Sequence, residues 1–435
     1  MPAFDRLQLL WDRLLQTLWW RPAVWSAGAV AVAVASSLVD QWIPDSWLPG
    51  LSDGVVKELL HLMASSMLVV STFALSVLAS AYAAAANAGT PRARRLVVAE
   101  PQSQKSVAVF LAAFIFSVVG LVAMGIGNYG PAGRLVLFAS AVGVLSWVVV
   151  SFMSYIDVLS RIGQVAHTIA IVERAAWKAL REHARQPLGG AQAADGPPEG
   201  AQAVQAQETG YVQYVDVQEL QQLAEAHSTL VYVVAHAGDL IHPQATLAYV
   251  TLDTAAGKGT GSIEALNKAV RKAFVIGPER TIEQDAGYGL IVLAEIAQRA
   301  LSPAVNDPGT AIAVMSSQTR LLIRTFATQT DHEAATCSRV TATPASLAPL
   351  VAIAYEPIAR FSLEHFDVIY QLARHMEALV QNVPGDVARE ALAVIQRAVE
   401  RADRAGVDAV DLAQWRGEAE KLERLVGRQA AGAQP

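Results

Sequence analysis

The chain contains few cysteines, which disulfide-stabilised secreted proteins need, and few charged residues, which are common in soluble domains. One of its 435 residues is a cysteine, Cys337, which excludes an internal disulfide and indicates a reducing compartment. Charged residues make up 17 % of the sequence, below the usual share of about a quarter, whereas hydrophobic residues make up 53 %. This composition is typical of a membrane protein that also carries a soluble part.

The sequence also lacks the short motifs of the common catalytic chemistries. It contains no G-x-S-x-G, H-E-x-x-H or G-x-x-x-x-G-K segment. His236 and His242 have neither the spacing nor the neighbouring cysteines of a zinc site. We therefore expect no enzymatic activity, no metal ion and no cofactor.

Positive charge is scarce in the part of the chain that follows the apolar runs. Residues 161–435 hold 24 Lys and Arg against 31 Asp and Glu. An acidic balance of this kind disfavours nucleic acid as a partner, because nucleic-acid binding requires a basic surface.

The sequence contains four long apolar runs, and each has about the twenty residues or more that a helix needs to cross a bilayer. The runs lie at about residues 23–40, 58–88, 106–127 and 134–156. A helix with leucines at helical spacing precedes them and is expected to lie in the membrane interface. Residues 1–160 are thus predicted to form a membrane domain with four transmembrane helices and an N-terminal interfacial helix.

The distribution of basic residues between the runs predicts the orientation. The connection 89–105 contains Arg92, Arg94, Arg95 and Lys105, whereas the connection 40–57 contains Lys57 alone. Because basic connections stay on the cytoplasmic side, both termini are predicted to be cytoplasmic.

The second run, 58–88, carries a stripe of hydroxyl side chains. Ser65, Thr72, Ser76 and Ser80 share one face of a helix at 3.6 residues per turn. In one reading these small residues let neighbouring helices approach closely and hydrogen-bond across the contact. In the other they line a water-filled path made by several copies of the chain, and both readings stay open at this point.

The rest of the chain is predicted to contain a connecting helix, a linker, a small α/β module and an α-helical domain. We expect the connecting helix over 161–186, a flexible linker over 187–208, a small α/β module over 209–260 and an α-helical domain over 261–428. Residues 429–435 are predicted to be a disordered tail. The spacing of Thr281 and Gln284 predicts a capping box that starts a helix, which runs to about Ala300.

The densest polar group in this helical domain is a candidate cytoplasmic site. It consists of Arg280, Asp285, Glu295, Arg299, Asn306 and Asp307. One reading is a site for an ion or a small ligand at a helical elbow. The other is a network of caps and turns, in which Asp307 caps a helix that begins at Pro308.

Three segments together resemble the DUF2254 family of predicted bacterial membrane proteins. They are ASSMLVVSTFALSVLASAY in the second run, GYVQYVDVQELQQLA with GDLIHPQATLAYV, and RTIEQDAGYGLIVLAEIAQRALSPAVNDPGTAI. The resemblance covers nearly the whole chain and is most specific over residues 280–312. It implies an inner-membrane protein with a cytoplasmic C-terminal region and brings no activity with it.

We therefore predict a mainly α membrane protein with four transmembrane helices, followed by a cytoplasmic small α/β module and an α-helical domain. Four spans with one polar stripe are too few to enclose a path alone, so a conducting role requires a homo-oligomer. The leading hypothesis is a homo-oligomeric channel or transport-like protein for an ion or small solute, gated by its cytoplasmic part. The alternative is a membrane-anchored signalling or scaffold protein without conduction.

Overall fold

The computed structural model describes residues 20–38, 52–88, 90–98, 101–126, 130–161, 164–251, 260–328, 334–344 and 346–432. The chain divides into two compact units, Met1–His167 and Thr168–Pro435. The predicted N-terminal interfacial helix lies outside the described residues.

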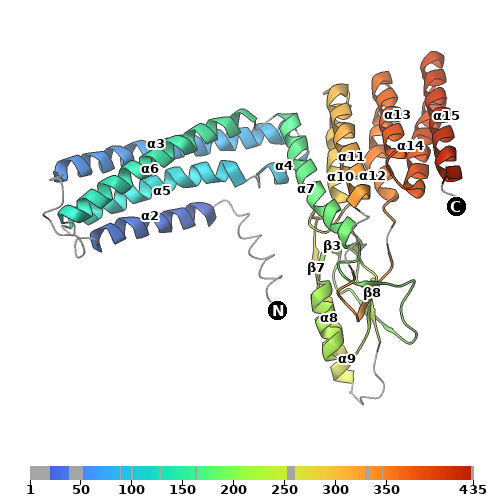
Figure 1. Ribbon diagram of the computed structural model, residues 1–435, viewed down its shortest axis with the longest axis horizontal. Helices are drawn as coiled ribbons and strands as arrows, with labels where there is room; N and C mark the ends of the chain where they lie inside the picture. Colours follow the sequence, from blue (N-terminus) through green and yellow to red (C-terminus); the bar gives the residue numbers. More distant parts are fainter. Residues whose placement is uncertain are drawn as a thin grey trace. The chain divides into compact units, whose positions relative to one another are not determined.

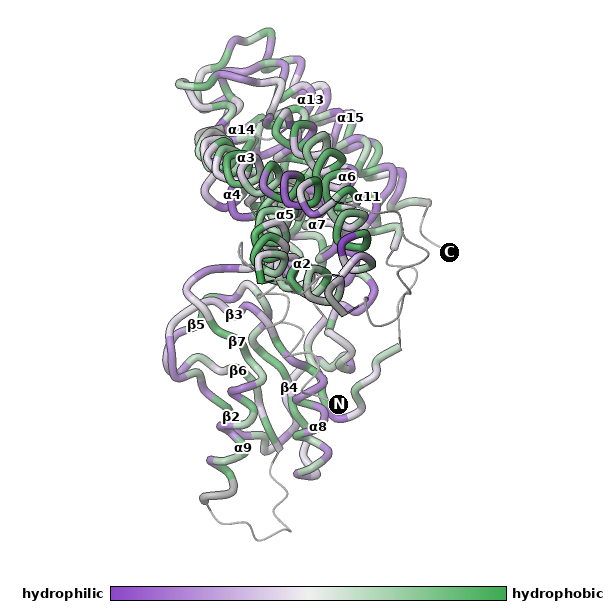
Figure 2. Tube along the Cα trace, turned by 90° about the vertical axis from the view of Figure 1, so that its left-hand side faces the viewer, coloured by the Kyte–Doolittle hydropathy of each residue, from purple (hydrophilic) through white to green (hydrophobic). Residues whose placement is uncertain are grey.

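The first unit is a helical bundle built around α5 (Pro101–Gly125). Helices α2 (Trp20–Leu38), α3 (Asp53–Ala88) and α6 (Pro131–Arg161) pack against α5, and the short α4 (Pro91–Val98) packs against α3. The long helices lie side by side (Figure 1), and hydrophobic residues are frequent in their turns, which Figure 2 shows end-on. Helices α4, α5 and α6 each begin at a proline, where the missing N–H leaves no helical hydrogen bond unmade.

Three of the described helices are long and apolar enough to cross a membrane. These segments are Asp53–Ala83, Lys105–Gly125 and Pro131–Arg161, and they correspond to the second, third and fourth predicted spans. The first predicted span coincides with α2, whose apolar segment Ala23–Ala33 is shorter, and its last two residues lie outside the described part. The role of α2 as a fourth span thus stays a prediction.

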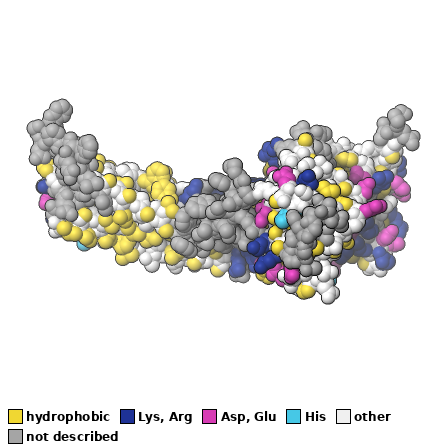
Figure 3. Space-filling model, turned by 90° about the horizontal axis from the view of Figure 1, so that it is seen from below, with side chains coloured by type: hydrophobic (Ala, Val, Ile, Leu, Met, Phe, Trp, Pro, Cys, Tyr) yellow, Lys and Arg dark blue, Asp and Glu magenta, His cyan; other side chains and the backbone are white. Residues whose placement is uncertain are grey.

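Large side chains fill the seams between these helices. Leu60 of α3, Phe116 of α5 and Leu137 of α6 are fully buried in one cluster, and Gly120 of α5 lets Leu60 approach closely. In a second cluster the hydroxyl of Tyr155 donates to the carbonyl of Ala74 at 2.7 Å. The outside of the bundle is also apolar: hydrophobic side chains dominate it in Figure 3, whereas charged side chains gather over the second unit.

The second unit includes most of α7 (Val165–Arg185) and a module of two sheets. The five-stranded sheet has the order β1-β8-β4-β6-β2, from β1 (Gln192–Ala193), β8 (Val340–Ala342), β4 (Val231–Val233), β6 (Thr246–Val250) and β2 (Gln202–Gln205). Strand β8 pairs in parallel with β1 and β4, and the other pairs are antiparallel. The three-stranded sheet has the order β5-β3-β7, from β5 (Leu240–Ile241), β3 (Gly210–Val215) and β7 (Phe274–Gly277).

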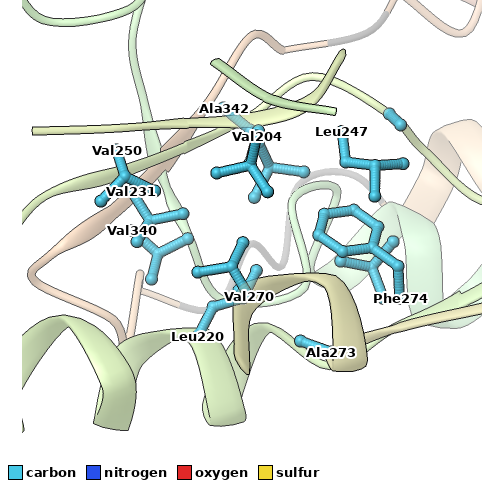
Figure 4. Close-up of a cluster of buried hydrophobic side chains, with 14 of the residues drawn as sticks. Val204, Leu220, Val231, Leu247, Val250, Val270, Ala273, Phe274, Val340 and Ala342 are labelled. Atoms are coloured by element: carbon cyan, nitrogen blue, oxygen red, sulfur yellow. The ribbon is translucent and has the colours of Figure 1, made fainter. Parts of the chain in front are cut away.

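Helices α8 (Val217–Ala226) and α9 (Thr260–Lys272) complete this module. Leu220 of α8 and Val270 of α9 point toward Val231, Val250 and other strand residues in a shared apolar core (Figure 4). The module therefore draws on residues from 191 to 342, so the predicted boundaries at 209 and 260 are too narrow.

The prediction of a flexible linker over 187–208 is wrong. Residues in this range form β1 and β2, and Val204 is 1 % exposed in the core of the module. The Ala-, Gln- and Gly-rich composition of this segment suggested disorder, but the segment is ordered because it pairs with β6 and β8, which lie far away in the sequence. Pairing with these distant strands holds the short, glutamine-containing strands β1 and β2 in place despite their low β-propensity.

The rest of the second unit is helical. It comprises α10 (Tyr288–Ala300), α11 (Pro308–Thr328), α12 (Pro349–Phe361), α13 (Phe366–Val380), α14 (Gly385–Ala405) and α15 (Ala409–Gly432). Helix α13 packs against α11, α14 and α15, and α12 packs against α10 and α14. Buried Glu356 of α12 forms ion pairs with Arg397 and Arg401, which tie α12 to α14.

Two predicted boundaries differ from the structure by a few residues. The connecting helix predicted over 161–186 corresponds to α7, which begins at Val165, whereas Arg161 is the last residue of α6. Helix α15 continues to Gly432, so the tail predicted to be disordered from residue 429 is helical over its first residues.

Candidate functional site

Four of the six Ser and Thr residues of α3 lie together on the outer surface of the first unit. Ser65, Thr72, Ser76 and Ser80, which we call the hydroxyl face, are all exposed in the single chain. The opposite side of α3 packs into the bundle through Leu60, Met67, Leu78 and others. The sequence prediction that these hydroxyls share one face is confirmed by this pattern of exposure.

Three of these hydroxyls donate hydrogen bonds to their own helix. Ser65 donates to the carbonyl of His61 at 3.0 Å, Thr72 to that of Leu68 at 2.8 Å and Ser80 to that of Ser76 at 3.1 Å. Such bonds reduce the cost of placing a hydroxyl in an apolar environment. The hydroxyl face is therefore compatible with contact to another helix and with contact to water.

Large apolar side chains border the hydroxyl face on both sides. Phe73 lies along one edge, Leu68 and Leu75 lie along the other, and Val69 lies within the face between Ser65 and Thr72; each of these four side chains is more than half exposed. The hydroxyl face is thus a mixed surface of small polar and large apolar side chains, of the kind that can pack against a second helix.

The second candidate group does not form one site. Arg280 and Asp285 precede α10, whereas Asn306 and Asp307 follow it. A helix of 13 residues is about 20 Å long, which separates the two ends. Glu295 is half-buried and Arg299 exposed on α10 between them.

At the first end, Asp285 is a buried carboxylate with four donors. Its Oδ2 accepts from Nε and Nη2 of Arg280 at 2.7 and 2.6 Å, and its Oδ1 accepts from the backbone N–H groups of Gly287 and Tyr288 at 3.2 and 3.0 Å. The side chain is 6 % exposed. Burial raises the pKa of Asp285, and the opposing effects of Arg280 and the two amides do not cancel this rise.

The Arg280–Asp285 pair packs directly on the turn that precedes β5. Gly238 in this turn has φ +96°, and a Cβ at this residue would lie 2.4 Å from Oδ2 of Asp285. Only a glycine meets both constraints. The pair therefore joins the α/β module to the start of α10, a structural role.

The capping box predicted at Thr281 does not form. Helix α10 begins at Tyr288, and the side chain of Gln284 instead bonds the backbone N–H and C=O of Val215 at the end of β3. The predicted end of this helix at Ala300 is confirmed.

At the second end, Asp307 caps α11 as predicted. Its Oδ1 accepts from the N–H of Thr310 at 3.0 Å and its Oδ2 from the Thr310 hydroxyl at 2.6 Å, and these bonds lower the pKa of Asp307. Asn306 adopts φ +50° in the preceding turn. Of the two readings of this polar group, these contacts favour the network of caps and turns.

Sequence reasoning missed a polar cluster inside the helical part of the second unit. The hydroxyl of Thr319 lies 2.6 Å from that of Tyr355 and 2.9 Å from Nδ1 of His375, and fully buried Gln318 donates to two backbone carbonyls. Burial raises the pKa of Tyr355 and lowers that of His375. The run SSQT at 316–319 was the signal that could have revealed it, because consecutive polar residues on a helix cannot all face solvent.

Glu173 of α7 extends this cluster to the surface. Its carboxylate accepts from the Ser317 hydroxyl at 2.7 Å and from Nη2 of Arg320 at 2.7 Å. Burial favours a higher pKa, but the bonds from Arg320 and Ser317 outweigh it and hold the pKa of Glu173 below its usual range.

This lowered pKa predicts a pH dependence of stability. A carboxyl group with a depressed pKa stabilises the fold above its unfolded-state value of 4.5, and the contribution is lost as the pH falls through the lower folded-state value. Thermal unfolding of Glu173→Gln between about pH 6 and pH 3 is expected to show a weaker acid dependence than the unmodified protein. Equal acid dependence in the two proteins would contradict this assignment.

Among the described residues, no three His, Cys, Asp or Glu side chains lie close enough to hold a metal ion.

Comparisons with known proteins identify a family and several relatives that match most of the sequence. The model of the family described as predicted membrane protein (DUF2254) matches residues 16–378. Uncharacterized protein Mb1321c of Mycobacterium bovis and uncharacterized protein Rv1290c of Mycobacterium tuberculosis are each 26 % identical over 325 residues, which is 72 % of this chain. The chain spans about 61 % of the length of these curated relatives. No solved structure matches significantly. The chain thus belongs to the DUF2254 family of predicted membrane proteins.

Proposed function

We propose that the protein is a multi-pass inner-membrane protein that assembles through the hydroxyl face of α3 and conducts an ion or small solute. In this proposal α2, α3, α5 and α6 cross the bilayer, and the second unit gates the path or senses a signal. The apolar outer surface of the bundle and the length of α3, α5 and α6 support the membrane placement.

One observation carries the proposal for conduction. The outer surface of a membrane bundle normally meets lipid, yet α3 presents hydroxyl residues along several turns of that surface. Polar residues in membrane helices usually face a protein neighbour or a water-filled cavity. Several copies arranged with α3 innermost would place Thr72 and Ser76 around a shared axis.

The distribution of basic residues supports the orientation. Helix α4 and the start of α5 carry Arg92, Arg94, Arg95 and Lys105. The positive-inside tendency supports a cytoplasmic position for this end of the bundle and, because two proposed spans follow α4, for the second unit as well.

A scaffold or signalling protein without conduction is the second candidate. The spacing of Thr72, Ser76 and Ser80 by four residues favours it, because small residues at this spacing let two helices pack closely. The bonds of Thr72 and Ser80 to their own helix also leave these hydroxyls without any need for water.

The double variant Thr72→Leu/Ser76→Leu separates the two candidates. In vesicles reconstituted with the full chain, ion flux measured with a panel of monovalent and divalent ions is expected to fall to the level of empty vesicles. The reason is that two leucines per copy would fill and dry the path.

Ser146→Leu on α6 is the matched control. Its hydroxyl is also exposed and donates to its own helix, to the carbonyl of Val142 at 2.9 Å, but it lies outside the hydroxyl face. This variant should keep the flux of the unmodified protein. Absence of flux from the unmodified protein, together with loss of oligomers in the double variant, would overturn conduction and favour the scaffold.

A further inference from the structure

Helix α4 is a basic amphipathic helix that joins two candidate membrane spans. It covers PRARRLVV, between the span segments Asp53–Ala83 and Lys105–Gly125. Eight residues of helix extend about 12 Å, far less than the thickness of a bilayer. Because α4 connects the ends of two proposed spans, it would lie at the depth of the lipid headgroups. This placement rests on the proposed function above.

The arginines of α4 lie on the side away from the bundle. Ala93 is fully buried, and α4 packs against α3. Arg92, Arg94 and Arg95 are exposed, at about 100° or more from Ala93 around the helix. The apolar side of α4 is thus held by protein, and its cationic side is presented outward.

The local structure also fixes this helix in place. The hydroxyl of Thr90 accepts from the N–H of Ala93 at 3.2 Å, which caps the first turn, and Pro91 occupies the first helical position. The three guanidinium groups are therefore presented by a preorganised helix. Exposed Lys105 at the start of the next span adds a fourth cation.

We infer that α4 is a binding surface for the headgroups of anionic phospholipids. Guanidinium groups bind phosphate oxygens in bidentate geometry, and cationic segments at headgroup depth are attracted to anionic lipid. Within residues 89–105 the sequence carries Arg92, Arg94, Arg95 and Lys105 against the single acidic residue Glu100, so this connection has a net positive charge. Charge complementarity thus selects an anionic lipid over a zwitterionic one.

Native mass spectrometry of the full chain in non-ionic detergent tests this inference. The protein is mixed with equal amounts of phosphatidylglycerol and phosphatidylcholine, and the retained lipids are counted. We expect preferential retention of phosphatidylglycerol that weakens as salt rises from about 0.1 M to about 1 M, where the screening length falls from about 10 Å to about 3 Å.

The triple variant Arg92→Gln/Arg94→Gln/Arg95→Gln should lose most of this preference, by roughly tenfold or more, because each basic residue near the surface contributes to headgroup affinity. The triple replacement of the same residues by lysine should keep it, since charge is retained. Arg416→Gln/Arg424→Gln/Arg428→Gln on α15 is the control, because it removes three positive charges from exposed residues of the second unit. This variant should keep the preference for phosphatidylglycerol.

An unchanged preference in the α4 glutamine variant would overturn the inference, as would an equal loss in the α15 variant. Equal displacement of the lipid by soluble glycerol phosphate would also overturn it, because the site would then bind a free phosphate and not a bilayer lipid. The flux and assembly of the α3 variants do not depend on these results, so failure of the two proposals can be told apart.

Discussion

Asp285→Ala is expected to lower the stability of the second unit by about 3 to 5 kcal/mol, the usual cost of removing one partner from a buried ion pair. The substitution leaves Arg280 without its carboxylate and removes the acceptor for two amides at the start of α10. Differential scanning fluorimetry of the full chain should show a transition lowered by about 10 °C.

Asp307→Ala is the matched control for this variant. Asp307 also caps a helix, but it is exposed, and it accepts hydrogen bonds from the amide and the hydroxyl of Thr310 in the helix that it caps. Loss of such a cap costs about 1 kcal/mol. If Asp285→Ala and Asp307→Ala had equal small effects, Asp285 would not join α10 to the α/β module as described.

The double variant Arg280→Ala/Asp285→Ala gives a further check. Because burial raises the pKa of Asp285, its charged form is costly to bury, and removal of both partners removes that cost as well. The double variant should thus lose less stability than the sum of the two single variants.

Gly289→Val is expected to destabilise the second unit by about 3 kcal/mol or more, because it overfills the space between α10 and α7. A Cβ at Gly289 would lie 2.4 Å from Cβ and 2.9 Å from Cα of Ala176. The helical backbone of α7 cannot yield as a flexible side chain would, so the two helices must separate. Thermal unfolding of the full chain measures the loss.

Two further variants make this prediction specific. Ala176→Gly should restore part of the stability of Gly289→Val, because it removes the methyl group of Ala176, the nearer obstacle, while the backbone of α7 still crowds the new side chain. Gly417→Ala on α15 introduces a methyl group into open space and should raise stability by up to about 1 kcal/mol. Equal behaviour of the Gly289 and Gly417 variants would contradict the close approach of α7 and α10.

Features that depend on neighbouring residues were predictable from the sequence. The span-forming helices follow from uninterrupted apolar runs, and the start of α11 follows from an aspartate that precedes a proline. The shared face of Ser65, Thr72, Ser76 and Ser80 follows from helical periodicity alone. In each case the physical cause lies within a few turns of one helix.

Features that depend on distant partners were not predictable in the same way. Gln284 bonds the backbone of Val215, 69 positions away, and for this reason it does not form a capping box with Thr281. Residues 192–193 and 202–205 are strands because β8 and β6 pair with them. The polar residues from Arg280 to Asp307 form a cluster in the sequence, but α10 holds the two ends apart.

Cysteine cross-linking in native membranes tests most directly whether copies of the chain meet through α3. The natural Cys337 is replaced by alanine, and single cysteines are introduced by Ser76→Cys on the hydroxyl face and by Val150→Cys on the exposed surface of α6. With copper phenanthroline and oxygen as the oxidant, assembly through the hydroxyl face predicts a disulfide-linked dimer for Ser76→Cys and little or none for Val150→Cys. A purely monomeric Ser76→Cys protein, or equal cross-linking at both positions, would contradict it.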